Sequence, residues 1–249
     1  MNFVSDFYRH RERLRVCIRE LATDPTALTL DVGCKGGDVT VENAAQQRHV
    51  IAVDIDLHEE WRDSPTNIDY LQADAMALPF ADETFDLASM TECLQYVPDP
   101  EQALDEIHRV LKPDAMLVVS FPEGNFLTNF MDPWNIVKTI KRLFRCAGDD
   151  DMIVRHIRVA RVLEHCRATW DVEQCLRRGS MLFIYCAWWI DKTQALRLAL
   201  LQRGAIGRFL GDTILKRLMR VQMWVMNVDF RFSIPVLWYN NIVRLRKRP

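Results

Sequence analysis

Residues 31–37, with the sequence DVGCKGG, have the composition of a ligand-binding turn. Glycine lacks a Cβ atom and tolerates positive φ, so such a turn lets a ligand approach the backbone closely. A dinucleotide-binding turn would need the pattern G-x-G-x-x-G, but Lys35 and Asp38 occupy two of its three glycine positions. The pattern therefore predicts a ligand-binding turn and excludes the usual NAD site. The glycines that supply this freedom are Gly33, Gly36 and Gly37.

A carboxylate stands at a suitable distance from this turn. Asp54 follows Gly33 by 21 residues, at the end of a segment predicted to be a strand. There it can accept hydrogen bonds from both ribose hydroxyls of an adenosine, and each charge-assisted bond contributes about 1.5–3 kcal/mol. A glycine turn and a strand-end aspartate also occur in α/β proteins for structural reasons alone. Further motifs are therefore needed to indicate a function.

The elements that would position these residues alternate between strands and helices. Short apolar runs predict buried strands, and Asp99 followed by Pro100 is typical of a helix start. This alternation predicts a mostly parallel α/β sheet with helices on both faces and ligands at the carboxyl ends of the strands. The expected strands are 27–32, 49–54, 68–72, 85–90 and 116–121, and the expected helices are 4–21, 39–47 and 100–111.

Further short motifs follow the turn in a fixed order. Together with the turn and Asp54 they resemble the class I S-adenosylmethionine-dependent methyltransferases, in the branch that acts largely on small molecules and lipids. The resemblance covers about residues 30–121, and it implies a Rossmann-like fold with S-adenosylmethionine as cofactor. The motifs are ADAMALPF at 73–80, TFDL at 84–87, VPDP at 97–100 and RVLKP at 109–113.

The resemblance also implies which residues bind the cofactor. Asp31, Gly33 and Gly37 would belong to the turn that lines its methionine and ribose part. Asp54 would bind the ribose hydroxyls, and Ile55 would pack on the adenine. A structural alternative for each carboxylate is a solvated loop residue or a helix cap.

Residues after the third and fourth strands would complete the site. The resemblance implies that Asp74 takes the adenine amino group beside the Ala75 backbone. Thr91 and Glu92 match positions that face the methionine end and the substrate. Glu92 and Tyr96 are the candidate catalytic residues, since a base is needed only for some methyl acceptors.

The sequence departs from the family pattern at three places. Lys35 replaces the middle glycine of the turn, which costs about 1–2 kcal/mol if the position needs positive φ. We expect its side chain to point outward or to pair with the cofactor's carboxylate. Gln95-Tyr96 replaces a frequent His-His pair, and Asp114-Ala115 replaces a Gly-Gly pair.

The charge is distributed unevenly along the chain. The formal net charge is only −2, but residues 1–176 hold 18 basic and 31 acidic residues, whereas residues 177–249 hold 14 basic and 3 acidic ones. A basic region of this kind favours an anionic partner, such as lipid headgroups or nucleic acid, or pairing with the acidic part. The two parts of the chain therefore face different partners.

The basic part is also predicted to be helical and apolar on one side. Amphipathic helices are expected at 132–145 and 205–228, with the apolar run MLFIYCAWWI at 181–190 between them. As a helix this run would reach about 15 Å, half of a bilayer's hydrocarbon core, so it does not predict a membrane span. It suits a peripheral position on an anionic membrane, a substrate lid or a homodimer interface. Residues 241–245 would return as a strand.

These features predict one methyltransferase domain over 1–249, with a cofactor-binding core at 24–121 and a helical C-terminal cap or insertion at about 178–232. The acceptor would be a small hydrophobic or lipid-linked molecule. A degenerate partner subunit and a nucleic-acid methyltransferase are the alternatives, and the aromatic pattern disfavours nucleic acid. We expect a cytoplasmic location, partly at the inner face of a membrane, no metal site, and free thiols at all seven cysteines.

Overall fold

The structure, a computed structural model, describes residues 16–17, 19, 21, 26–45, 49–63, 65–123, 136, 157–231 and 240–249. The chain divides into two compact units. The first comprises Met1–Glu123, Met152–Leu176 and Asn241–Pro249, and the second comprises Gly124–Asp151 and Arg177–Asn240. The expected insertion at 178–232 falls inside the second unit. That the whole chain forms one domain stays a prediction.

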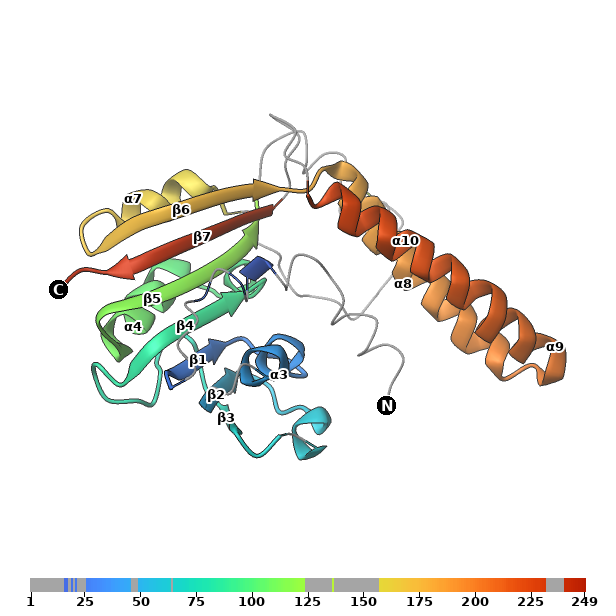
Figure 1. Cartoon of the computed structure of the whole chain (residues 1–249), viewed down its shortest axis with the longest axis horizontal. Helices are drawn as coiled ribbons and strands as arrows, with labels where there is room; N and C mark the ends of the chain where they lie inside the picture. Colours follow the sequence, from blue (N-terminus) through green and yellow to red (C-terminus); the bar gives the residue numbers. More distant parts are fainter. Residues whose placement is uncertain are drawn as a thin grey trace, which may run out of the picture. The chain divides into compact units, whose positions relative to one another are not determined.

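The first unit is built on a seven-stranded sheet with the order β3-β2-β1-β4-β5-β7-β6. Neighbours among β1 to β5 pair in parallel, and Figure 1 shows β7 running against β5 and β6. This arrangement confirms the predicted Rossmann-like sheet. The strands are β1 (Leu28–Val32), β2 (His49–Asp54), β3 (Ile68–Gln72), β4 (Phe85–Thr91), β5 (Leu111–Pro122), β6 (Trp170–Arg178) and β7 (Asn240–Lys247).

The sequence did not predict helix α7 (Val159–Cys166) or strand β6, which is largely polar. Glu173 of β6 forms ion pairs with Arg244 (2.9 Å) and Arg246 of β7. Because charged cross-strand pairs hold this edge, its sequence lacks the apolar alternation by which strands are recognised. The predicted return strand at 241–245 is confirmed as β7.

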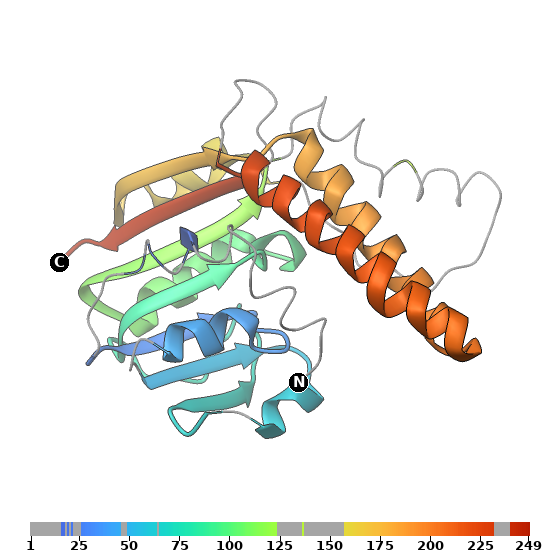
Figure 2. The ribbon, with the colours of Figure 1, turned by 45° about the vertical axis from the view of Figure 1, so that its right-hand side comes forward.

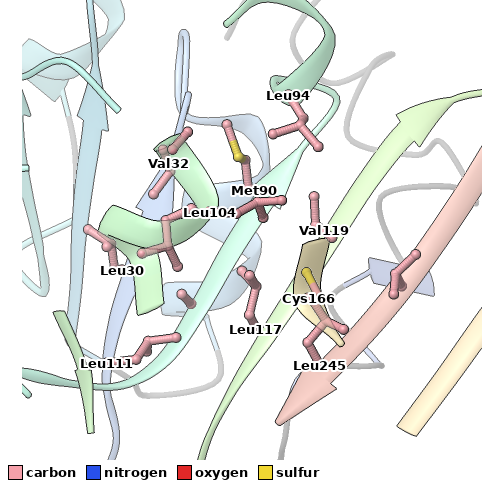
Figure 3. Packing of buried hydrophobic residues seen from close by; sticks show 14 of the residues in the cluster. Leu30, Val32, Met90, Leu94, Leu104, Leu111, Leu117, Val119, Cys166 and Leu245 are labelled. Atoms are coloured by element: carbon pink, nitrogen blue, oxygen red, sulfur yellow. The ribbon is translucent and has the colours of Figure 1, made fainter. Parts of the chain in front are cut away.

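Helix α4 (Pro100–Val110) begins where the sequence predicts. The Asp99 carboxylate accepts hydrogen bonds from the N–H groups of Glu101 and Gln102, at 3.1 and 3.2 Å. Such a cap satisfies donors that otherwise lack partners at a helix start. The apolar side of α4 is fully buried against the sheet (Figure 3). Its buried side chains include Ala103, Leu104, Ile107 and Val110.

The sheet is covered on both faces, as expected. Residues that alternate along β2 divide between two apolar clusters, with Val53 in one and Val50 and Ala52 in the other. The first cluster contains side chains of α4 and α7, and the second contains Ala44 of α3 (Asp38–Ala44). Helix α3 is shorter than the predicted 39–47. The predicted helix 4–21 lies largely outside the described residues.

The second unit contains a helical hairpin. Helix α8 (Met181–Leu201) is followed by α9 (Gly204–Phe209), a π-helical turn η3 (Leu210–Leu215) and α10 (Lys216–Asp229). Figures 1 and 2 both show α8 and α10 side by side. The predicted helical segment 205–228 is thus confirmed, whereas 132–145 lies outside the described residues apart from Ile136.

Polar contacts hold the hairpin together at both ends. The Ser180 hydroxyl donates to Asp229 (2.6 Å), and Arg197, which is buried, donates to Asp212 (2.7 Å). A Cβ atom added to Gly207 would lie 2.2 Å from the Leu200 carbonyl oxygen, so glycine permits the close approach there. In the described part of the chain, no helix is both long and apolar enough to cross a membrane.

Candidate functional site

The predicted turn lies between β1 and α3, and backbone hydrogen bonds fix it to the end of β2. Gly33 and Cys34 both donate from their N–H groups to the Val53 carbonyl oxygen, at 2.8 and 3.1 Å. The Lys35 carbonyl accepts a hydrogen bond from the Trp61 indole at 2.8 Å. Trp61 belongs to the short helix η1 (Glu59–Asp63), so a segment beyond β2 also supports the turn.

The backbone of the turn adopts positive φ at three positions. They are Gly33 (+72°), Lys35 (+48°) and Gly37 (+87°), and Gly36 is not among the positive-φ residues of the described chain. Two of the three glycines therefore use their conformational freedom, and Lys35 takes the left-handed conformation at a cost of about 1–2 kcal/mol. The Lys35 side chain is exposed, which agrees with the expected outward orientation.

Asp54 lies beside this turn at the carboxyl end of β2. One carboxylate oxygen accepts the Lys35 N–H at 2.8 Å, and the other accepts the Asp56 N–H at 3.1 Å. His58 Nε2 stands 3.5 Å from the second oxygen. Each oxygen keeps acceptor capacity for a further donor. Asp54 is therefore both the anchor of the turn and a carboxylate available to a ligand.

Asp31 occupies a different environment, beneath the turn. It is only 2% exposed, and it accepts hydrogen bonds from the hydroxyls of Thr40 (2.6 Å) and Ser89 (2.8 Å). These contacts tie β1 to α3 and to β4. Burial raises the pKa of Asp31 to about 6, and the two hydroxyl donors oppose that rise. Its predicted part in cofactor binding is untested, and the geometry favours an indirect one.

The raised pKa of Asp31 predicts a pH dependence of stability. The folded protein holds this proton up to about pH 6, whereas the unfolded chain releases it near pH 3.8. The free energy of unfolding therefore decreases as the pH rises from about 3.8 to about 6. A shift of this size corresponds to about 3 kcal/mol. Asp31→Asn cannot ionise and should lose this contribution to the slope. Denaturant unfolding of both proteins at pH 4, 5, 6 and 7 measures it, with Asp69→Asn on the exposed face of β3 as control. Parallel curves for Asp31→Asn and wild type would contradict the prediction.

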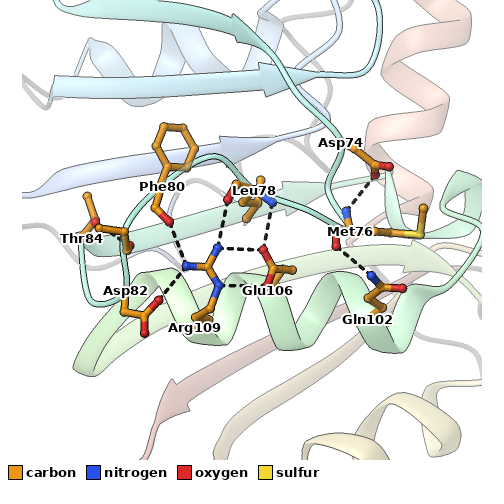
Figure 4. Close-up of polar contacts among 10 residues, drawn as sticks. Asp74, Met76, Leu78, Phe80, Asp82, Thr84, Gln102, Glu106 and Arg109 are labelled. Atoms are coloured by element: carbon orange, nitrogen blue, oxygen red, sulfur yellow. Dashed lines mark hydrogen bonds and ion pairs between the residues drawn. The ribbon is translucent and has the colours of Figure 1, made fainter.

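Asp74 is held by a rigid loop that follows β3. Its carboxylate accepts the Met76 N–H (2.9 Å), and the Met76 carbonyl accepts the Gln102 amide of α4 (3.0 Å). Further along, Arg109 of α4 donates to the carbonyl oxygens of Leu78 (3.0 Å) and Phe80 (2.8 Å) (Figure 4). The loop is therefore clamped onto α4 along its length.

A carboxylate completes this clamp. Glu106 accepts the Leu78 N–H at 2.9 Å and two donors of the Arg109 guanidinium at 2.8 and 2.9 Å. The hydrogen bond from Arg109 holds the pKa of Glu106 below its usual range. These contacts explain why the motifs at 73–80 and 109–113 occur together, although they are distant in the sequence. Arg109 of the second motif fixes the loop of the first motif, and that loop positions Asp74.

The residues after β4 include the candidate catalytic carboxylate. Glu92 adopts positive φ (+54°), and its N–H donates to the Ser120 carbonyl at 2.9 Å. The Ser120 hydroxyl donates to the Glu92 carboxylate at 3.3 Å, and the Gln95 amide donates to the Glu92 carbonyl at 2.9 Å. Glu92 is thus held in a strained conformation by partners on two sides, as is frequent at functional sites.

Two buried polar atoms near Glu92 have no hydrogen-bond partner among the described residues. They are the Thr91 hydroxyl and the Gln95 side-chain carbonyl oxygen. Buried polar atoms without partners are rare and costly, so their presence here favours a polar ligand at this position. A small polar group such as the amino acid end of a cofactor fits these acceptors and donors. Glu92 and Tyr96 follow directly, and Tyr96 is exposed in η2 (Leu94–Tyr96).

The structure brings the predicted site residues together at one edge of the sheet. Strands β3, β2, β1 and β4 are adjacent and parallel, so the residues at their carboxyl ends are neighbours. Ile55, 59% exposed, follows Asp54 as a packing surface for a ring, and Ala75 follows Asp74. Their individual roles stay predictions. The residues gathered at this edge are Asp31, Gly33, Gly37, Asp54, Ile55, Asp74, Ala75, Thr91, Glu92 and Tyr96.

Sequence reasoning missed several residues that shape the site. Cys93 packs directly on Gly33, and the Tyr70 hydroxyl packs on Gly37. Burial, with Asp54 and Asp31 nearby, raises the pKa of Cys93 to about 12, so this thiol stays protonated. Ser120 could have been found from the strand register, because it pairs with Thr91 across β4 and β5. The contacts of Cys93 and Tyr70 leave no signal in the sequence.

Part of the chain is similar in sequence to known methyltransferases. Residues 30–119 match the family model described as "Methyltransferase domain". The chain is 36% identical over 121 residues to the ubiquinone/menaquinone biosynthesis C-methyltransferase UbiE of Vibrio vulnificus. The aligned region covers 44% of this chain and 46% of that protein. The chain thus matches less than half the length of this relative. Residues 30–119, less than half of the chain, therefore match a methyltransferase domain.

Solved structures show the same fold. The [4+2]-cyclase SpnF aligns with a TM-score of 0.62 and 18% identity, over 94% of this chain and 79% of that one. The 1,6-didemethyltoxoflavin-N1-methyltransferase of Burkholderia thailandensis, solved with its substrate and S-adenosylhomocysteine, aligns with a TM-score of 0.58 and 16% identity, over 98% and 82%. At this identity the likeness concerns the fold. One of the two is described as a cyclase, so the reaction must be argued from the site.

Proposed function

We propose that this protein is an S-adenosylmethionine-dependent methyltransferase with a small, hydrophobic or lipid-linked acceptor. One observation carries the proposal: the carboxylates of Asp54 and Asp74 and the unpartnered Thr91 hydroxyl follow neighbouring parallel strands inside a methyltransferase domain. Together these groups match an adenine, a ribose and an amino acid end. Asp54 would hold the ribose, Asp74 the adenine amino group, and Thr91 the methionine end.

The bound cofactor supplies a methyl group on a sulfonium centre. Because methyl transfer is an in-line displacement, the protein accelerates it mainly by positioning the acceptor and excluding water. The rigid turn at 33–37 and the clamped loop at 74–80 suit this task, since both are fixed by hydrogen bonds before a ligand arrives. Preorganisation of this kind avoids an ordering cost at the moment of binding.

Glu92 is the group that we assign to the acceptor. Its carboxylate is oriented by Ser120, and its backbone by Ser120 and Gln95, so the base is fixed at the edge where the acceptor would bind. It would accept a proton from an acceptor that must lose one. Tyr96, exposed one helical turn further along, would contact the acceptor.

The nature of the acceptor rests on two observations. A relative is described as a quinone biosynthesis C-methyltransferase, and the second unit adds exposed apolar and basic surface. Both favour a hydrophobic or lipid-linked acceptor, such as a quinone-like compound or a polyprenyl-linked glycan. We accordingly propose a cytoplasmic protein that works at the inner face of a membrane.

Ligand binding and product analysis test the proposal. Purified protein should bind S-adenosylhomocysteine in calorimetry and transfer a labelled methyl group to a compound in lipid extracts. Glu92→Gln should lower kcat by about 100-fold, because a positioned base contributes at least that factor, while S-adenosylhomocysteine affinity changes little. Glu83→Gln is a matched control, since Glu83 is exposed and also has positive φ (+55°). Labelling of polar metabolites alone would contradict the acceptor assignment.

A degenerate partner subunit is the second candidate. The strained Lys35 and the Gln95-Tyr96 replacement favour it, and the cyclase shows that the fold serves other reactions. In this case S-adenosylhomocysteine would show no detectable heat of binding, and the enzyme proposal would fail.

A further inference from the structure

The helical hairpin of the second unit exposes large apolar side chains. Ile206 is 78% exposed, Phe209 60% and Trp224 65%, and Trp189 on α8 is also exposed. Single exposed apolar residues are ordinary on protein surfaces, but a group of this size on one pair of helices indicates an interaction surface.

Helix α10 shows how the exposed side arises. Its methionines at 219, 223 and 226 are buried, whereas Ile214 in the preceding turn, Leu218 and Val221 are exposed. Residues three and four positions apart share a helix face, so each set forms its own stripe. The expected apolar stripe of 205–228 is therefore the side that the hairpin leaves exposed. The methionines, not this stripe, lie in the interior.

Helix α8 is mostly apolar, and its described side chains divide between buried and exposed positions. Ile190 and Thr193 are buried, but Leu182, Trp189 and Leu196, spaced seven apart, are exposed. A helix with few polar residues is normally buried on more than one side. Among the residues that the structure describes, none fully covers this exposed side of α8.

The charge around these side chains is mostly positive. Residues 177–231 hold 10 basic and 3 acidic residues. Two of the acids are already engaged, Asp212 with Arg197 and Lys216, and Asp229 with Ser180. At the tip of the hairpin, defined by Ile206 and Phe209 of α9, the neighbouring arginines at 203 and 208 are exposed. The arginines at 217 and 220, beside the exposed apolar stripe of α10, are exposed as well. The occupant of this surface must therefore be apolar and anionic.

We propose that the hairpin face, defined by Trp189, Leu196, Ile206, Phe209, Leu218 and Trp224, docks on an anionic lipid surface. A second copy of this chain would bring the same arginines together, and like charges at short distance repel. Single-stranded nucleic acid is bound through successive aromatic platforms, but most of the large apolar side chains exposed along the whole hairpin are aliphatic. Lipid offers headgroup phosphates to the arginines and acyl chains to the apolar residues.

The hairpin would lie in the interfacial region rather than cross the bilayer. Arginines at both ends of α9 stay with the headgroups while Ile206 and Phe209 enter the acyl boundary. Tryptophans on α8 and α10 prefer the same depth, because their rings are amphipathic. This inference depends on the proposed membrane location, but it is independent of methyl transfer.

Vesicle flotation of the full chain tests the hairpin face. Binding is expected to vesicles of phosphatidylcholine and phosphatidylglycerol in equal parts, and to fall as salt rises, since salt screens exposed charges. Ile206→Ser with Phe209→Ser should weaken the partition coefficient at least tenfold. Arg203→Gln with Arg208→Gln should weaken it about fivefold per arginine on anionic vesicles, with little change on pure phosphatidylcholine.

Matched controls come from exposed residues of the first unit. Val172→Ser removes an exposed apolar side chain of β6, and Arg167→Gln removes an exposed cation after α7. Both should bind vesicles as wild type does. Unchanged S-adenosylhomocysteine affinity and thermal unfolding show that each variant is folded.

The outcomes separate this inference from the proposed function. The inference would be refuted if the wild type did not bind anionic vesicles. It would also be refuted if the tip variants, Ile206→Ser with Phe209→Ser and Arg203→Gln with Arg208→Gln, bound them as well as the wild type. Tip variants that only convert a dimer to a monomer in light scattering, or binding to an oligonucleotide instead of vesicles, would refute it too. Vesicle binding without S-adenosylhomocysteine binding would support the face and refute the methyltransferase.

Discussion

Asp54→Ala is expected to weaken S-adenosylhomocysteine binding by about 500-fold. Two charge-assisted hydrogen bonds to the ribose are lost, each contributing about 1.5–3 kcal/mol. The substitution also removes the acceptor of the Lys35 and Asp56 N–H groups, so the turn loses part of its anchor. Asp54→Asn keeps the shape of the side chain without its charge. Its affinity for S-adenosylhomocysteine should lie between those of the wild type and Asp54→Ala. Isothermal titration calorimetry measures all three proteins.

Asp56→Ala is the control for charge alone. It removes the same charge two residues away, on an exposed side chain, and it should change the affinity less than threefold. Equal losses of affinity in Asp54→Ala and Asp56→Ala would mean that the ligand responds to the net charge of the region and not to a direct contact with Asp54. Unchanged affinity in Asp54→Ala would remove this carboxylate from the site. S-adenosylhomocysteine is preferred over the cofactor because its sulfur carries no charge.

Local signals predicted most of the first unit. Asp99 caps α4 and Pro100 begins it because both act through their own backbone neighbours, and a motif records them directly. Strands β1, β2 and β4 are largely buried apolar runs, which the sequence also records. Strand β6 depends on ion pairs between Glu173 and two arginines more than 70 residues away. Hydrophobic periodicity cannot predict such a strand.

The candidate site shows the same division. The sequence predicted the turn and the three strand-end positions, all of which are local signals. It did not decide which of the glycines at 33, 36 and 37 adopt positive φ, because glycine permits that conformation but does not require it. Whether a glycine uses its freedom depends on contacts such as that of Lys35 with Asp54, which only the folded chain shows.

The hairpin illustrates a further limit. The spacing of apolar residues over 205–228 correctly predicted a helix, but the helix carries two apolar stripes. Methionines fill the interior against α8 because they are unbranched and adapt to a close packing. The aliphatic stripe remains exposed. Periodicity therefore identifies a face that will be buried by something, without identifying the partner.

Gly33→Ala is expected to lower the free energy of unfolding by about 4 kcal/mol. It should also weaken binding of the cofactor at the turn 33–37. A Cβ atom at this position would lie 2.1 Å from the Cys93 sulfur and 2.4 Å from the Cys93 Cβ atom. The positive φ of +72° adds about 1–2 kcal/mol of strain for any residue with a side chain. Overpacking in a tight site contributes about 1–3 kcal/mol more. Denaturant unfolding measures the sum.

Gly204→Ala separates the two causes of this loss. Gly204 has the same φ of +72°, but an added Cβ atom would meet nothing within 4 Å. Its substitution should therefore cost only the backbone strain. A double-mutant cycle with Cys93→Gly then isolates the steric part, and the coupling energy should be about 2 kcal/mol, since Cys93→Gly removes the side chain that the added Cβ atom would overlap. A coupling energy near zero would mean that Gly33 is required by the backbone alone. In that case the turn is shaped by β1 and β2, and Cys93 merely fills the space beside it.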